Sequence, residues 1–157
     1  MKTRCLLKIA MIFIVAVCIA GAGGLYAGTT VQDVIKMENK AYAKHKKSIV
    51  EFSHKKHATD YKAGCGECHH DDKNKPLNDL KEGDAVQNCI ECHSKPGLKP
   101  KGKDAKKLSK KEALEYHAEA IHQNCQGCHK DFNKKNKADK SKSAPTKCKE
   151  CHPAKTK

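Results

Sequence analysis

The chain has 157 residues, of which 32% are charged and 4% are aromatic, and its formal net charge is +14. It contains no tryptophan. This composition excludes a domain built around an ordinary side-chain core, because so few large apolar residues cannot offset the entropy of ordering the chain. A fold therefore requires another source of apolar volume.

The N-terminus has the pattern of a secretory signal peptide. Positive residues at positions 2, 4 and 8 precede a continuous apolar run over 9–20, and small residues follow as far as Ala27. We therefore expect residues 1–27 to be a signal peptide that exports the protein to the periplasm. The alternative is a retained anchor, although the apolar run is short for a membrane span.

The mature chain begins with a polar lead-in over residues 28–48, in which 31–42 is a candidate short helix. The following run, 49–52, is rich in β-prone residues and predicts a short strand or hairpin.

Four copies of the pentapeptide Cys-x-x-Cys-His follow. This motif is the attachment site of c-type haem, in which two thiols bond to the porphyrin and the next histidine binds the iron. The sequence therefore predicts four covalently bound c-type haems. The attachment cysteines are Cys65, Cys68, Cys89, Cys92, Cys125, Cys128, Cys148 and Cys151. The proximal iron ligands are His69, His93, His129 and His152.

All eight cysteines of the mature chain lie in these motifs, so none remains for a disulfide. Haem would supply the apolar core that the composition lacks, and we expect the polypeptide without haem not to fold. The signal peptide removes three positive charges and leaves +11 on the mature chain. The haem propionates would cancel much of that charge.

Two other uses of Cys-x-x-Cys are alternatives. Paired motifs can bind zinc, but two zinc sites would leave the four following histidines unexplained. Thioredoxin-like chemistry uses the same dithiol, but this chain has no βαβ pattern.

The interval between the second and third motifs contains a loop and the best-signalled helix. Residues 94–111 are rich in Lys, Gly and Pro and are typical of a surface loop. Ser109 and Glu112 form a capping box, and apolar residues at helical spacing continue to Ile121. This helix leads into the third motif, and residues 130–147 are again Lys-rich and loop-like.

These patterns predict a mainly α fold with long loops and little regular structure, preceded by a short N-terminal strand or hairpin. Residues 49–157 would form a single compact multihaem cytochrome domain whose haems make its core.

Each haem iron needs a sixth ligand or an open site. The mature chain contains one methionine, Met37, which cannot serve four irons. The histidines outside the motifs are His45, His54, His57, His70, His117 and His122. Four ligands from six candidates predict two histidines on every iron. Helical periodicity favours His117, which lies nearer the apolar helix face than His122, so the residues alone leave both open.

The spare histidines are arranged as in a known family. The run 52–57, Phe-Ser-His-Lys-Lys-His, precedes the first motif, and that motif continues into His70. His122 stands three residues before Cys125, and Ala-Pro-Thr-Lys at 144–147 leads into the fourth motif. Together these features resemble the class III cytochromes c, small tetrahaem electron carriers of sulfate-reducing bacteria, over about residues 49 to 152. The best-known members often have four residues between the cysteines of their second and fourth motifs, whereas here all four motifs have two.

The resemblance implies a distal ligand for each haem, in motif order His54, His70, His57 and His122. Their proximal partners, in the same order, are His69, His93, His129 and His152. In the family, adjacent ligands such as His69 and His70 tie neighbouring haems together. The family pattern thus favours His122 over His117, and a helix ending near Ile121 would free His122 to turn. His45 is not expected to be a ligand.

Two histidines on each iron leave no vacant site for a substrate, which favours electron transfer over enzymatic chemistry. They also leave the haem at low potential, since methionine ligation raises it. The resemblance implies a carrier between hydrogenase or formate dehydrogenase and membrane-bound multihaem complexes. The alternatives are a non-specific terminal metal reductase and a haem subunit of a larger redox complex.

The lysines gather around the fourth motif, where only Asp131, Asp139 and Glu150 oppose them. This end would steer partners with acidic docking surfaces towards the fourth haem, and the alternative is a solvated tail. Nucleic acid is rejected as a partner, because an exported haem protein meets none. We expect a monomer without stable membrane insertion after signal cleavage.

Overall fold

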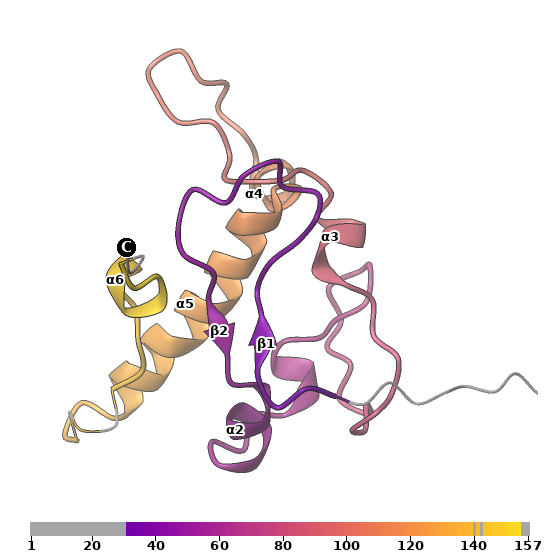
Figure 1. Cartoon of the computed structure of the whole chain (residues 1–157), viewed down its shortest axis with the longest axis vertical. Helices are drawn as coiled ribbons and strands as arrows, with labels where there is room; N and C mark the ends of the chain where they lie inside the picture. The colour runs from indigo at the N-terminus through magenta and orange to yellow at the C-terminus, as the bar shows by residue number, and fades with distance from the viewer. Residues whose placement is uncertain (1–30, 140, 142, 155–157) are drawn as a thin grey trace, which may run out of the picture.

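The computed structural model describes residues 31–139, 141 and 143–154; the expected signal peptide at 1–27 lies outside them. Its ordered elements are short and are separated by long loops (Figure 1). In chain order they are β1 (Ile35–Lys36), β2 (Glu51–Phe52), α2 (His54–Thr59), the 3-10 turn η1 (Cys65–Glu67), α3 (Cys89–Cys92), α4 (Lys110–Leu114), α5 (His117–Lys135) and α6 (Cys148–Cys151). The prediction of a mainly α fold with little regular structure is confirmed.

The two strands form an antiparallel hairpin. Ile35 pairs with Phe52 and Lys36 with Glu51, and Met37 N donates to Val50 O at 2.9 Å. The expected strand is thus confirmed at its C-terminal end, and the candidate helix at 31–42 is wrong. A short isolated helix has few bonds to offset the cost of its nucleation, whereas here the extended segment gains a partner strand.

The predicted capping box before α4 is confirmed. Ser109 Oγ accepts from Glu112 N at 3.2 Å, and Glu112 Oε2 accepts from Ser109 N at 2.8 Å. The helix is nevertheless interrupted after Leu114, because another segment takes its backbone groups. Lys95 N donates to the carbonyl of Glu115, and the Lys95 carbonyl accepts from His117 N.

Helix α5, which follows this interruption, is longer than predicted. It passes through the whole third motif to Lys135, so the expected end near Ile121 is wrong, as is the expected loop at its first residues, 130–135. Lys134 and Lys135 occupy the last turn, where positive charge interacts favourably with the helix dipole.

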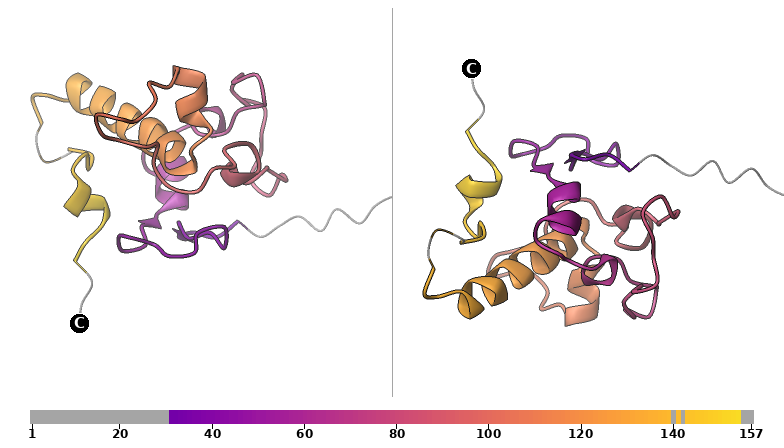
Figure 2. Two further views of the ribbon diagram at one scale, coloured as in Figure 1. Left: turned by 90° about the horizontal axis from the view of Figure 1, so that it is seen from above. Right: turned by 90° about the horizontal axis from the view of Figure 1, so that it is seen from below.

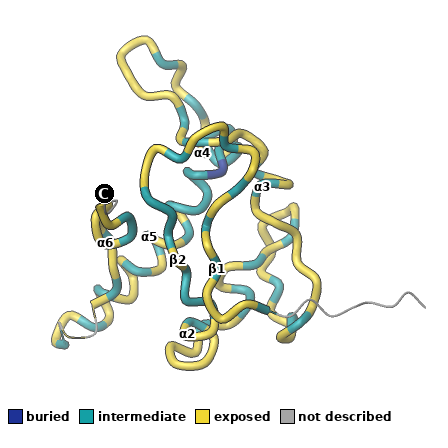
Figure 3. Tube along the Cα trace, viewed as in Figure 1, coloured by how far each residue is buried: buried dark blue, intermediate teal, exposed yellow. Residues whose placement is uncertain are grey.

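Side chains alone make almost no core (Figure 3). Among the described residues no apolar side chain is buried, and only His117, at 7% exposure, counts as buried. Several large apolar side chains are exposed, including Tyr61 at 62% and Phe132 at 37%. This agrees with the composition, which predicted that protein atoms could not supply the core.

Helix α5 runs diagonally across the view with the hairpin in front of it (Figure 1). In both views of Figure 2, α6 lies to one side of α5 and away from α3. The segment between α3 and α4 projects from the body as the expected surface loop (Figure 1). Its turns use Gly97 and Gly102 at φ 92° and 132°, values that glycine adopts without a steric penalty. No helix in the described part of the chain is long and apolar enough to cross a membrane.

Candidate haem-binding sites

Each Cys-x-x-Cys-His motif lies on a turn of helix. The first lies on η1, the second on α3, the third within α5 and the fourth on α6. Residues at i and i+3 share a face of a helix, so both thiols of a motif lie on one side. In the second and fourth motifs the residue before the second cysteine also caps the turn. Glu91 accepts from Asn88 N at 3.1 Å, and Glu150 accepts from Lys147 N at 2.8 Å.

The four motifs converge on one region. Desolvation by the surrounding chain, together with the charges of thiols in the third and second motifs, raises the pKa of the Cys68 thiol to about 11. Desolvation also raises the pKa of Cys125, followed by the charges of Cys151 and Cys89. Thiols of the third motif are thus close enough to interact electrostatically with thiols of each of the other three motifs.

Three pairs of histidine rings stand at nearly the same separation. Their ring centroids are 5.9 Å apart in His70–His93, 6.1 Å in His57–His129 and 6.2 Å in His122–His152. Two metal–nitrogen bonds of about 2 Å each, plus the distance from each nitrogen to its ring centre, separate opposite axial imidazoles by roughly 6 Å. The residues present therefore fit an iron porphyrin between the rings of each pair.

Of the eight histidines predicted as ligands, the two outside these pairs, His54 and His69, are also neighbours. Desolvation lowers the pKa of His69, and the next contributions are the positive charges of His54 and then His70. His54 and His57 are three residues apart on α2, so they extend from similar sides of one helix. The ring of His57 packs on Phe52 at 4.6 Å and Tyr61 at 5.3 Å between centroids.

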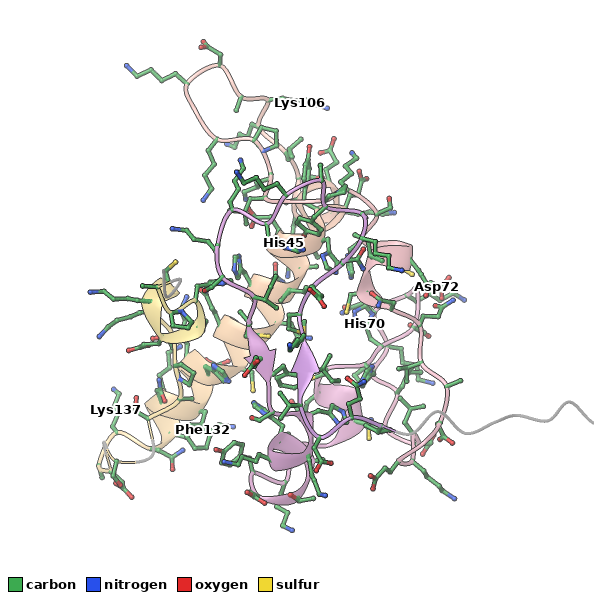
Figure 4. All side chains as sticks on the ribbon, viewed as in Figure 1. His45, His70, Asp72, Lys106, Phe132 and Lys137 are labelled. Atoms are coloured by element: carbon green, nitrogen blue, oxygen red, sulfur yellow. The ribbon has the colours of Figure 1, made fainter. Side chains whose placement is uncertain are left out.

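Backbone carbonyls orient five of these eight rings through Nδ1. The partners are His57 with Ser53 O at 2.9 Å, His70 with Asp71 O at 2.8 Å, His93 with Leu114 O at 2.5 Å, His129 with Pro145 O at 2.6 Å and His152 with Ser48 O at 2.7 Å. A carbonyl only accepts, so Nδ1 carries the hydrogen and Nε2 keeps the lone pair that a metal ligand needs. Figure 4 shows His70 beside α3, which bears the second motif.

The two histidines left over have other contacts. His117 Nδ1 lies 2.8 Å from Tyr42 Oη, and Tyr42 stacks on His45 at 4.9 Å. Burial lowers the pKa of His117, and the charge of His93 lowers it further. The apolar helix face that favoured His117 in the sequence therefore carries it towards the lead-in, while His122 faces the ring of His152.

A model of the class III cytochrome c family matches residues 30–152 of the chain. The chain belongs to the class III cytochrome c family. A cytochrome c3 from Desulfovibrio desulfuricans is 34% identical to it over 115 residues, which cover 72% of this chain and 86% of that protein. The resemblance drawn from the motifs is confirmed, and this class III cytochrome c is a multihaem electron-transfer protein.

Sequence reasoning missed several residues that contact or neighbour the histidines of this class III cytochrome c. Ser48 and Tyr42 contact histidines 104 and 75 residues away, and no local pattern marks them. Glu119 lies one turn before His122 and has a buried Oε1 without a hydrogen-bond partner. Its charge raises the pKa of His122, against the larger lowering by burial and by His152. The sequence signal that could have identified Glu119 is its position three residues before His122. The described residues contain no cluster of three or more His, Cys, Asp or Glu side chains that could hold a metal ion.

Proposed function

We propose that this class III cytochrome c binds four haems, each with two histidine ligands, and carries electrons at low potential between periplasmic redox proteins. The observation that supports this most directly is the pairing of the rings. Three proximal histidines each have one partner ring near 6 Å, and the fourth, His69, has His54 as its strongest electrostatic neighbour among the charged groups.

The proposed assignment follows motif order. The cysteines of each motif hold one haem covalently. The iron ligands are His69 with His54 in the first site, His93 with His70 in the second, His129 with His57 in the third and His152 with His122 in the fourth. His117 and His45 remain outside the ligand set, because their ring contacts are with Tyr42.

When bound, c-type haem supplies a one-electron couple whose potential depends on its axial ligands. Histidines that occupy both axial positions exclude substrates from the metal, so the protein acts as a carrier rather than an enzyme. The Nδ1–carbonyl bonds make the imidazoles more basic, which favours the oxidised state and a low potential. The apolar faces of four porphyrins would also provide the missing core.

Docking is proposed at the fourth site, with an acidic surface on a partner such as a hydrogenase, a formate dehydrogenase or a membrane-bound multihaem complex. Lys149 lies inside the fourth motif and is exposed. Lys135 and Lys137 are exposed at the end of α5. Clustered charge of one sign raises association rates with an oppositely charged partner, and salt screens the effect. The carrier would be a periplasmic monomer after removal of residues 1–27.

The first test is the haem content and ligation of the mature holoprotein. We expect an intact mass that exceeds the polypeptide by four haem units, and no release of haem in denaturing acid. Electron paramagnetic resonance of the oxidised protein should show low-spin iron only, and carbon monoxide should bind poorly to the reduced protein. A mass with two haems, or one full equivalent of high-spin iron in the wild type, would contradict the proposal.

A further inference from the structure

Ser48 makes two hydrogen bonds to the residues that end the fourth motif. Its backbone carbonyl accepts from His152 Nδ1 at 2.7 Å. Its hydroxyl donates to the carbonyl of the next residue, Pro153, also at 2.7 Å. We call these two bonds the Ser48 bracket. They join positions 104 and 105 residues apart, so they bring the lead-in and the C-terminal motif together.

The fourth motif needs such support because its own helix is minimal. Helix α6 has four residues, Cys148–Cys151, and one helical turn is unstable by itself. His152 follows it with φ −119° and ψ 80°, outside the helix. The ring of His152 is therefore held mainly by contacts with other parts of the chain, among which the structure gives the ring of His122 and the carbonyl of Ser48.

Ser48 itself stands on a supported segment. It precedes β2 by three positions, and Val50 between them accepts from Met37 N at 2.9 Å. The hairpin thus fixes the backbone from which the Ser48 carbonyl and hydroxyl extend. Because the hydroxyl holds Pro153, the backbone next to His152 cannot move away without breaking that bond, and the carbonyl stays aligned with Nδ1.

We propose that Ser48 is a positioning residue for the fourth site, and that its hydroxyl keeps the Ser48 carbonyl on His152 Nδ1. The proposal rests on the assignment of His152 as an iron ligand. A hydrogen bond to the outer nitrogen of a ligating histidine fixes the ring and makes it a stronger donor to the metal. Weakening this bond lowers that donor strength, so it raises the reduction potential of the fourth haem and leaves the other three unchanged.

Ser53 offers a matched control. Its carbonyl accepts from His57 Nδ1 at 2.9 Å, as that of Ser48 does from His152. Its side chain makes no capping bond to α2. Removing the Ser53 hydroxyl therefore leaves the backbone bond at the third site as it is.

The experiment compares the holoproteins of wild type, Ser48→Ala, Ser48→Thr and Ser53→Ala. Redox titration measures the four potentials. Proton NMR of the fully reduced protein measures exchange of the His152 Nδ1 hydrogen with solvent. In Ser48→Ala we expect one potential to rise and the His152 hydrogen to exchange about fivefold faster, as for the loss of one ordinary hydrogen bond. Threonine keeps the hydroxyl and should restore both values, and Ser53→Ala should match wild type.

Unchanged potentials and exchange in Ser48→Ala would overturn the positioning role, as would a threonine variant that behaves like the alanine variant. Loss of His152 ligation in Ser48→Ala, seen as one high-spin haem, with low-spin iron only in Ser48→Thr, is the expected result in a stronger form. The proposed ligation fails separately, through a wild-type protein with fewer than four haems or with high-spin iron. Four low-spin haems without a response to Ser48→Ala would reject only the role of Ser48.

Discussion

The third and fourth sites share helix α5 but are braced from different parts of the chain. At the third site, His129 Nδ1 donates to Pro145 O, and Asn133 holds the neighbouring Ala144 through two bonds of 2.8 and 2.9 Å. His129 and Asn133 lie one turn apart on α5. At the fourth site, the equivalent brace is Ser48, more than 100 residues away from His152.

The same two sites also differ in the angle between the planes of their paired histidine rings. The third pair, His57 with His129, is close to parallel at 25°, whereas the fourth, His122 with His152, is close to perpendicular at 87°. A brace within 16 residues can form as soon as the helix and its following loop exist. A brace across 104 residues depends on the whole fold. The fourth site should therefore respond to changes in distant segments that leave the third site intact.

Opening either site should give the largest effect. We expect His122→Ala to create one five-coordinate haem, seen as high-spin iron in electron paramagnetic resonance and as carbon monoxide binding to one haem of the four. His57→Ala should do the same at the third site. His117→Ala is the control and should keep all haems low-spin, because its ring contacts Tyr42. High-spin iron in His117→Ala, with none in His122→Ala, would reverse the assignment of the fourth site.

Charge reversal should show whether partners dock at the fourth site. We expect Lys147→Glu with Lys149→Glu, beside the fourth haem, to slow reduction by an acidic hydrogenase roughly tenfold at low salt, and less at high salt. Stopped-flow kinetics at several ionic strengths would measure this.

The matched control reverses Lys73 and Lys75, which are exposed. Lys101 in the projecting loop is unsuitable as a control, because its charge lowers the pKa of His122. Equal losses from both pairs would mean that net charge governs docking, rather than a patch at the fourth site.

Removing the two hydrogen bonds between Asn133 and Ala144 should disturb the third site alone. Asn133→Ala deletes both bonds to Ala144, which are part-buried, and should lower the free energy of unfolding by about 1–3 kcal/mol. One reduction potential should shift, and it should differ from the one that Ser48→Ala shifts. Asn136→Ala is the control, because the Asn136 side chain donates to Phe132 O within the same helix end and not to the Ala144 segment. Guanidinium unfolding and redox titration of the holoproteins test this, and a shift of the same potential in both variants would remove the distinction.

Acid should loosen the fourth motif before the third, and we expect this effect to be smaller than those of the substitutions above. Backbone bonds from Lys147 and Thr146 lower the pKa of Glu150 below its ordinary 4.5. A carboxyl whose pKa is lower in the folded state stabilises the fold above its unfolded pKa, and this contribution is lost as pH falls through the folded pKa. The third motif has Gln126 and Gly127 between its cysteines, so it has no such group.

Exchange of the Nδ1 hydrogens can be compared at the two sites in reduced protein at pH 6 and pH 3. We expect His152 to lose more protection than His129 on acidification, and Glu150→Gln to remove much of that difference. Glu112→Gln, which alters the cap of α4 instead, should leave the difference in place. Equal acid responses of His152 and His129 in the wild type would contradict the role of Glu150.

The sequence predicted what local patterns encode. The capping box at Ser109 and Glu112, the strand at Glu51–Phe52 and the family were all read from short motifs. The break after Leu114 was not foreseen, because it depends on backbone bonds to Lys95, a segment that only the fold brings near. The same reason hid Ser48. The ligand pairs stay a prediction, which the ring separations support.

The length of α5 was missed for a different reason. The apolar periodicity extends only to Ile121, since the polar residues after it offer no apolar face. In the structure the helix continues to Lys135 and carries the thiols and the ring of the third motif. The face of α5 that bears this motif would be buried against a cofactor. A pattern of apolar side chains does not reveal such a face.

The contact between Ser48 and Pro153 also sets an order of assembly. The residues of the first site lie between 54 and 69, so they are all present early in synthesis of the chain. The proposed fourth site needs the motif at 148–152 and the lead-in at Ser48 together, so it can close only after the chain has been made as far as that motif. The contacts of Ser48 thus join the lead-in to the last motif, and a product truncated before residue 148 would lack this closure.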